Sequence, residues 1–427
     1  MPASIFTVVF VVALLASLGV RFWLAARQVA HVRAHRDATP AAFADHVDTA
    51  AHRKAADYTV AKQRLGVLES AADAVVLVAL TLGGGLAWLL AATETTALPP
   101  LLRDLLLLVG VALIGGIVAL PFSWWRTFRL EERFGFNRTT LGVWLADLAK
   151  GLAVGAVLGV PLTLLVLWLM RSAGAWWWLY AWLAWMAFQM LVLVLFPTVI
   201  APLFNRFSPL PAGDARERIE QLLARCGFRA SGLFVMDGSK RSGHGNAYFT
   251  GFGRAKRVVF FDTLLTRLAP EEIEAVLAHE LGHFRLRHVI KRIVWSAVLS
   301  LALLALLAWL VQAPWFYAGL GIAEGDVAVA MARPGVALAL FMLALPVFTF
   351  ALAPLSAAYS RRHEFEADKF AAEHASAAAL VAALIKLYED NAATLTPDPL
   401  HSAFYDSHPP AAIRVARLQS LAVGSAG

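Results

Sequence analysis

Long apolar runs alternate with polar stretches along the whole chain. Seven of these runs hold about 18 residues or more, which is enough for a helix to cross the hydrocarbon core of a bilayer. They lie at about 4–25, 70–92, 104–124, 149–170, 175–198, 291–312 and 335–357. The pattern therefore predicts a mainly α-helical, multi-pass membrane protein with seven transmembrane helices.

The first apolar run could be a signal peptide or a true span. It has no basic segment before it, and an arginine-rich segment follows it, so we interpret it as a span. The fourth and fifth runs are separated by only a few residues around 171–174. This short separation predicts a tight helical hairpin.

Basic residues are concentrated in the loops after the first and third runs, whereas the loops near 93–103 and 313–334 hold very few. Basic loops stay in the cytoplasm. The first, third and fifth loops and the C-terminus are therefore predicted to be cytoplasmic, with the N-terminus outside. The basic residues that set this orientation are Arg21, Arg27, Arg33, Arg36, Arg53, Lys54, Lys62 and Arg64, followed by Arg126, Arg129, Arg133 and Arg138.

Two polar regions, 199–290 and 358–427, lie on the predicted cytoplasmic side and can form one α+β domain. The first region predicts a helix (DARERIEQLLARCGF), a strand (GLFVMDG), the segment NAYFTGFG and a second strand (KRVVFF). A helix then begins near Pro270, because proline suits the first turn of a helix. The chain is thus expected to divide into a membrane region (1–198), a first catalytic part (199–290), two further spans (291–357) and a second catalytic part (358–427).

Composition supports the membrane interpretation and argues against nucleic acid as a partner. Apolar residues make up 59% of the chain and charged residues only 16%, against about a quarter charged in soluble proteins. We attribute the net charge of +7 to basic cytoplasmic loops rather than to nucleic-acid binding. Cys226 is the one cysteine, so an internal disulfide is excluded, and we expect it to be a small packing residue.

The segment AVLAHELGHFRLRH, residues 275–288, carries the candidate chemistry. His279 and His283 are four residues apart, so on a helix both rings project from one face and can bind one metal. Glu280 lies about 100° away around the helix, where it can reach a metal-bound water. This is the H-E-x-x-H arrangement of zinc peptidases. The alternative is a polar helix face at the membrane surface.

A hydrolytic zinc site needs a third protein ligand. The extended metzincin pattern is excluded, because positions 286 and 289 are Leu286 and Val289. Downstream, Glu364 and Asp368 share a helix face, so one can bind the metal and the other can orient a ligand histidine. Spacing does not decide which does which. The other polar residues are expected to lie elsewhere: His288 at the membrane interface, Glu366 in solvent, and His363 and His374 on the surface.

Several stretches of the chain resemble the type-I CAAX prenyl protease family of integral-membrane zinc endopeptidases, and they occur in the family's order. They are EERFGFNRTT (131–140), FPTVIAPLFNRFSPLP (196–211), GSKRSGHGNAYFTGFG (238–253), KRVVFFDTLL (256–265), HELGH (279–283), SRRHEFEAD (360–368) and SHPPAAIR (407–414). Membrane heat-shock metalloproteases share the zinc motif but resemble the chain only around the catalytic core.

The resemblance implies a zincin-like catalytic domain, seven spans around a water-filled chamber, and one zinc ion per chain. It makes His279, His283 and Glu364 the metal ligands and Glu280 the catalytic base. Asp368 would then orient a ligand histidine. Asn246 and Ala247 would lie on a strand that pairs with the backbone of the substrate. His408 and Arg414 would approach the metal site, where His408 would help to hold the oxyanion.

Three functions remain open at this stage. The first is a CAAX-type endopeptidase acting on prenylated or hydrophobic peptides, and the second is a quality-control protease for damaged membrane proteins. The third, a metal-bound transporter or receptor without catalysis, gives no role to Glu280 beside the ligands. The alanine- and arginine-rich composition favours a bacterial inner membrane over the endoplasmic reticulum.

Overall fold

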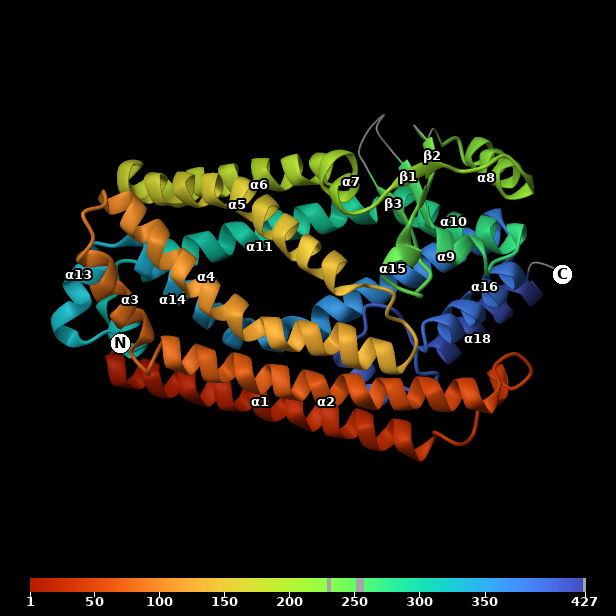
Figure 1. Cartoon of the computed structure of the whole chain (residues 1–427), viewed down its shortest axis with the longest axis horizontal. Coiled ribbons are helices and arrows are strands. Elements are labelled where there is room, and N and C mark those ends of the chain that lie inside the picture. Colours follow the sequence, from red (N-terminus) through yellow and green to blue (C-terminus); the bar gives the residue numbers. More distant parts are fainter. Residues whose placement is uncertain (229–231, 251–256, 425–427) are drawn as a thin grey trace.

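Long helices make up most of the molecule (Figure 1). The structure is a computed structural model that describes residues 1–228, 232–250 and 257–424. The apolar runs form helices, because a backbone in hydrocarbon must satisfy its hydrogen bonds within its own segment. Their bounds are α1 Ala3–Ala34, α2 Thr49–Leu80, α3 Gly85–Glu94, α4 Pro100–Trp125, α5 Leu141–Ser172, α6 Trp177–Leu195, α11 His288–Leu310 and α14 Pro334–Thr349.

Within the described residues, six helical segments are long and apolar enough to cross a membrane, and one bent pair raises the number to seven. The bent pair is α2 and α3, whose axes differ by 51°. The bend falls at three consecutive glycines, and Gly84 has a φ of +76°, which is costly for a residue with a side chain. The multi-pass prediction is confirmed with six spans in the described residues, and the predicted number of seven is reached if the bent pair counts as one span.

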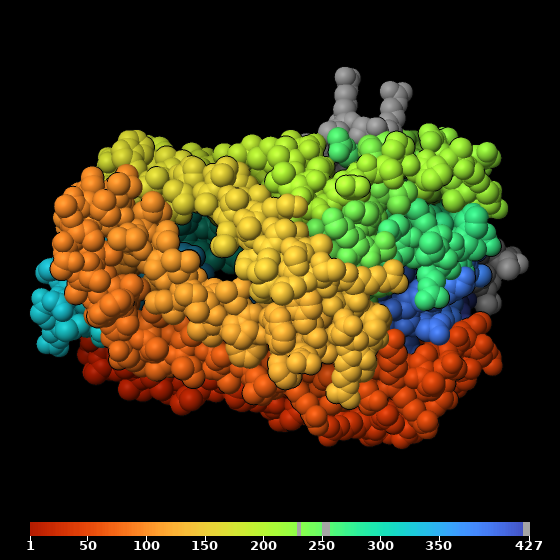
Figure 2. Space-filling model, in the orientation of Figure 1, coloured from red at the N-terminus to blue at the C-terminus, as the bar shows by residue number. Residues whose placement is uncertain are grey.

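The membrane helices form a wall that is one helix thick over part of the molecule. Only Asp104 and Leu107 are buried in α4, and only Leu167 and Leu169 in α5. Figure 2 shows a deep opening in this wall, bordered by the orange and yellow part of the chain, with teal helices behind it. The helices therefore surround a hollow interior, as the family resemblance implies.

A small sheet lies at one end of the helical body (Figure 1). Its strands are ordered β1-β2-β4-β3, with β2 and β4 parallel and the outer strands antiparallel to their neighbours. The bounds are β1 Phe207–Pro209, β2 Gly232–Met236, β3 Ala247–Thr250 and β4 Arg257–Phe261. The strands expected from GLFVMDG and KRVVFF are present, and the NAYF segment forms the edge strand β3.

Helix α10 (Pro270–Arg285) runs through the centre of this end of the molecule and packs against α8 (Asp214–Arg225), α15 (Ala353–His374) and α16 (Ala377–Asp390). Side chains from these helices and from β4 make one apolar core. Two further helices complete the domain: α17 (Pro399–Tyr405) and α18 (Ala411–Gly424). Cys226 ends α8 and packs partly buried against this core, as expected of a small packing residue.

The last span leads directly into the helix that carries the candidate acidic residues. A short turn, Phe350–Leu352, joins α14 to α15, and the two count as one apolar segment from Pro334 to His374. Glu364 and Asp368 are therefore fixed to a membrane helix, and α10 brings the histidines to them.

Candidate metal centre

His279 and His283 lie one turn apart on α10. The helix begins with Pro270 at its first turn, and the carboxylate of Glu272 accepts a hydrogen bond from the backbone N–H of Ala269 at 2.8 Å. This capping satisfies an otherwise free donor at the helix start. The Nε2 atoms of His279 and His283 lie 3.2 Å apart, on the face that meets α15. Both rings therefore point to the same position.

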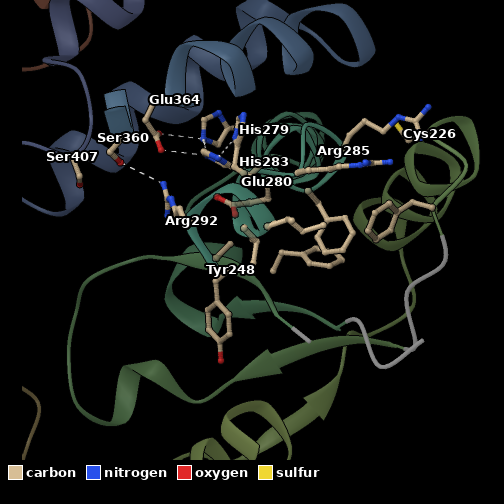
Figure 3. Close-up of a pocket in the computed structure, with 18 of the residues that line it drawn as sticks. Cys226, Tyr248, His279, Glu280, His283, Arg285, Arg292, Ser360, Glu364 and Ser407 are labelled. Carbon is tan, nitrogen blue, oxygen red and sulfur yellow. Dashed lines mark hydrogen bonds and ion pairs between the residues drawn. The ribbon is translucent and has the colours of Figure 1, made fainter. Parts of the chain in front are cut away.

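Glu364 supplies the third corner of this group (Figure 3). Its Oε1 lies 3.3 Å from Nε2 of His283, and its Oε2 lies 3.5 Å from Nε2 of His279. One donor atom from each residue lies within 4.8 Å of the others. Three protein ligands of this type, two imidazoles and a carboxylate, are those of a catalytic zinc site with one open position.

Two observations show that these residues fit a metal ion. A tetrahedral ion with ligand bonds of about 2.0–2.1 Å separates its ligands by about 3.3 Å, which matches the spacing of the two Nε2 atoms. Oε2 of Glu364 is buried and has no hydrogen-bond partner within the described residues. A cation between the three side chains would satisfy this oxygen.

Asp368 and Arg414 hold His279 from behind. Oδ1 of Asp368 accepts from Nδ1 of His279 at 2.9 Å, and Arg414 donates to both carboxylate oxygens of Asp368 at 2.7 Å. All three side chains are buried. The spacing of Glu364 and Asp368 left their roles open. The geometry puts Glu364 beside Nε2 of both histidines and Asp368 beside Nδ1 of His279.

The surroundings of His279 act on its charge in opposite directions. Burial and the nearby Arg414 guanidinium favour the neutral ring. The hydrogen bonds to Asp368 and Glu364 outweigh them and raise the pKa of His279 to about 9. The metal-free ring therefore holds a proton tightly, and a bound metal takes the place of that proton.

Glu280 lies beside the three candidate ligands and lines the cavities on both sides of them. Burial raises the pKa of its carboxyl group, and the neighbouring histidines oppose this shift. A half-buried carboxylate with a raised pKa is a better proton acceptor than one in water. Its position suits a group that exchanges protons with a reacting water.

Two cavities meet at this centre, one of about 690 Å³ and one of about 490 Å³. Both are lined by Ala247, His279, Glu280 and His408. The smaller cavity is mainly apolar, with leucines and an aromatic ring from α16. The larger cavity has aromatic and basic walls. The side chains found only in the smaller cavity include Leu380, Leu384, Leu387 and Tyr388. Those found only in the larger cavity include Phe249, Phe284, Arg285 and Arg292.

The edge strand β3 borders this cleft. Ala247 is its first residue, and β3 pairs on one side with β4 in the described sheet. Asn246 precedes it, is exposed, and accepts a hydrogen bond from the backbone N–H of Ala247 through its side-chain oxygen at 2.8 Å. The free edge of β3 can therefore pair with an added strand.

His408 approaches the same centre from the loop before α18. Its ring is largely exposed, and its Nε2 lies 3.4 Å from Oε2 of Glu364. Its Nδ1 lies 3.1 Å from the hydroxyl of Ser407. The structure thus brings together all nine residues that the sequence singled out, and places Asn246 and Ala247 on the rim.

The expectations for His288 and His363 were wrong, because both side chains are buried. His288 and His363 are 1% and 2% exposed, and their rings stack with centroids 4.0 Å apart. Glu366 is half-buried, and its Oε2 lies 3.0 Å from Nε2 of His288. For His288 the reason is Arg287, which lies between α10 and α11 with a φ of +57°, in the left-handed region, and turns the chain so that His288 lies against α15. His374 is exposed, as predicted.

A support for the cleft that the sequence did not single out comes from the segment after α4. The backbone N–H of Gly243 donates to the carbonyl of Phe136 at 3.0 Å, and the ring of Phe136 stacks on His244. Arg241 donates to both carboxylate oxygens of Asp147 on α5. The EERFGFNRTT stretch and the loop before β3 are therefore docked together, which holds the edge strand in place.

Family models match almost the whole chain. A model described as CAAX prenyl protease N-terminal, five membrane helices, matches residues 28–206, and the model of peptidase family M48 matches residues 209–422.

Known proteins match over similar lengths. The CAAX prenyl protease 1 homolog of Oryza sativa subsp. japonica is 35% identical, over 75% of this chain and 74% of that protein. CAAX prenyl protease 1 of Saccharomyces cerevisiae is 31% identical, over 89% of this chain and 88% of that protein. The crystal structure of S. mikatae Ste24p aligns with a TM-score of 0.87 and 28% identity, covering 98% of this chain and 99% of that one.

Proposed function

This chain belongs to peptidase family M48 and is a multi-pass membrane metalloprotease; we propose that it is a zinc endopeptidase that cleaves near the C-terminus of prenylated or hydrophobic peptides. The observation that carries the proposal is the triangle of His279, His283 and Glu364 with Glu280 beside it, facing a cleft bordered by a free strand edge. We place one zinc ion in this triangle.

Bound zinc supplies Lewis acidity, which polarises a carbonyl group and makes water a better nucleophile at neutral pH. Glu280 accepts the proton of the attacking water and later delivers it to the leaving amine. Its raised pKa, which is due first to burial, suits both steps. Asp368 and Arg414 keep the His279 ring in the orientation that leaves Nε2 free for the metal.

The substrate lies in the cleft as an added strand. We place its backbone along the free edge of β3, where Asn246 and Ala247 provide hydrogen-bonding groups. His408 lies at the open side of Glu364 and would donate to the oxyanion that forms as the peptide carbonyl is attacked. An extended peptide end fits this arrangement better than a folded segment.

The substrate class follows from the name carried by the relatives and from the site. The matched relatives are named CAAX prenyl protease 1, and the apolar cavity beside the centre suits a hydrophobic peptide end. We also propose that the catalytic domain is cytoplasmic and the N-terminus outside, because the basic loops lie on the cytoplasmic side. The alanine- and arginine-rich composition is the ground for proposing a bacterial inner membrane. We further propose that the chain divides into a membrane region (1–198), a first catalytic part (199–290), two further spans (291–357) and a second catalytic part (358–427).

The test is cleavage of a quenched fluorescent, farnesylated CAAX-type peptide by the purified protein in detergent. Glu280→Ala should lower kcat by about 10²–10⁴-fold, because the general base is lost. A chelator should abolish activity, and added zinc should restore it. The matched control is Glu373→Gln, which changes an exposed carboxylate on α15.

A Glu280→Ala variant that cleaves as fast as the wild type would overturn the mechanism. Cleavage of only unprenylated or unfolded membrane substrates would keep the mechanism but assign the chain to quality control. Transport that survives Glu280→Ala, without cleavage of any substrate, would favour the non-enzymatic alternative.

A further inference from the structure

A second group of metal-binding side chains lies beside the catalytic triangle. It consists of His288, the first residue of α11, and of His363 and Glu366 on α15. One donor atom from each of these residues lies within 4.8 Å of the others. His363 and Glu366 are three residues apart on the helix, so their side chains share one face. This face of α15 is not the one that holds Glu364 and Asp368.

His363 gives the strongest indication that this group binds a ligand. Its side chain is 2% exposed, and its Nδ1 is buried without a hydrogen-bond partner within the described residues. A buried polar atom without a partner costs about 1–3 kcal/mol, so native proteins rarely leave one. The ring stacks on His288 and meets Tyr359 edge-on, with centroids 4.3 Å apart. Neither ring contact satisfies the nitrogen, whereas a metal ion would.

We propose that His288, His363 and Glu366 form a second binding site for a zinc-type divalent metal, separate from the catalytic one. Two imidazoles and a carboxylate are ligands that Zn²⁺ and Co²⁺ accept. Oε2 of Glu366 and Nε2 of His288 are already 3.0 Å apart, close to the ligand spacing of a tetrahedral ion. A tilt of the stacked rings would bring His363 to the same ion.

The site is reachable but electrostatically less favourable than the catalytic triangle. His288 lines the 690 Å³ cavity, which gives an ion a path to it. Arg362 donates to Oε1 of Glu366 at 3.1 Å, and Nζ of Lys291 lies 3.8 Å from Oε2. These two cations partly neutralise the carboxylate and oppose a third positive charge. The second site is therefore expected to fill only at metal concentrations above those that load the catalytic one.

The two sites are one hydrogen bond apart. Nδ1 of His283 lies 2.9 Å from Nδ1 of His288. A metal at Nε2 of His283 leaves its Nδ1 as an N–H donor toward His288, and Nε2 of His288 then donates to Glu366. A metal at Nε2 of His288 would leave the proton of that ring on Nδ1, so two N–H groups would face each other. Filling the second site should therefore weaken the catalytic one.

The first test measures bound metal, without any substrate. The full-length protein in detergent is dialysed against a series of free Zn²⁺ or Co²⁺ concentrations, and bound metal is counted by mass spectrometry. Wild type should reach two equivalents in two steps. His363→Phe, which keeps an aromatic ring for stacking, and Glu366→Gln should stop at one. The matched control is His374→Phe, an exposed histidine on the same helix, which should still reach two.

One equivalent in wild type at saturating metal, or two equivalents in both His363→Phe and Glu366→Gln, would overturn the second site. Because this count needs no cleavage, it stands apart from the proposed function. A second experiment rests on that function: excess Zn²⁺ should inhibit peptide cleavage by wild type. In His363→Phe and Glu366→Gln, the Zn²⁺ concentrations that inhibit wild type should leave cleavage unchanged. Equal inhibition of all variants would refute the coupling between the sites.

Discussion

His279 decides how the centre divides its affinity between protons and metal. Burial and Arg414 favour the neutral ring, but the hydrogen bonds to Asp368 and Glu364 raise its pKa from the ordinary 6.5 to about 9. Below this pKa the metal-free ring is protonated and must lose a proton before the metal binds. The first prediction is that His279 makes zinc affinity rise about tenfold per pH unit between pH 7 and 9.

Zinc affinity is measured against a calibrated chelator at each pH, in the protein purified in detergent. The affinity should level off above the pKa of His279, where the ring is already neutral. An affinity that is flat from pH 7 to 9 would contradict the prediction.

A single substitution can test how Asp368 acts on His279. Asp368→Asn keeps the shape but removes the charge that stabilises protonated His279 and pairs with Arg414. Zinc affinity at pH 7 should fall about 10–100-fold. The pH at which affinity levels off should move down, because the pKa of His279 falls. Glu373→Gln on the same helix is the control, and an unchanged pH profile in Asp368→Asn would rule out this role.

Between elements, the approach of α10 to α15 determines whether the three candidate ligands meet. A methyl group at Gly282 would lie 3.0 Å from the Cα of Ala367 and 3.1 Å from the Cβ of Phe370. Gly282→Ala should therefore push the helices apart, cost about 1–3 kcal/mol of stability, and lower the bound zinc. Thermal unfolding in detergent and metal content measure both effects.

Gly151→Ala is the matched control, because a methyl group at Gly151 of α5 has nothing within 4 Å. It should leave stability unchanged or raise it slightly, since alanine is the better helix former. Equal effects of the two substitutions would show that the helix contact at Gly282 is not tight.

The elements that could be predicted are those fixed by local pattern. The spans follow from apolar length, and α10 follows from Pro270 and the spacing of the histidines. The bend after Leu80 could have been anticipated from the three glycines. Two features could not: the left-handed turn at Arg287, which no residue preference announces, and the burial of His363, which depends on packing between helices distant in sequence. Helical projection beyond Arg287 therefore placed His288 wrongly.

Helices α3 and α14 lie at the end opposite the sheet (Figure 1), and there a group of charged side chains joins the membrane helices. Asp104 of α4 is fully buried and accepts from Arg333 at 2.6 Å and from Arg171 of α5 at 2.5 Å. Arg333 also pairs with Glu94. These contacts join α3, α4, α5 and the start of α14 around the hollow interior. They lie at the other end of the molecule from the candidate ligands, so we expect them to stabilise the membrane helices without affecting catalysis.

The matching prediction compares two arginines that both pair with Glu94. Arg333→Met removes one of the two arginine partners of the buried Asp104 and should cost about 1–3 kcal/mol, because Arg171 still pairs with the carboxylate. Arg103→Met removes a more exposed partner of Glu94 and should cost less than about 1 kcal/mol. Thermal unfolding in detergent measures both. Zinc content and cleavage rate per folded molecule should stay at wild-type values in each variant, because the helices that hold the metal ligands are joined to each other at the other end. A loss of bound zinc in Arg333→Met below its unfolding temperature would instead mean that the far end of the body positions the centre.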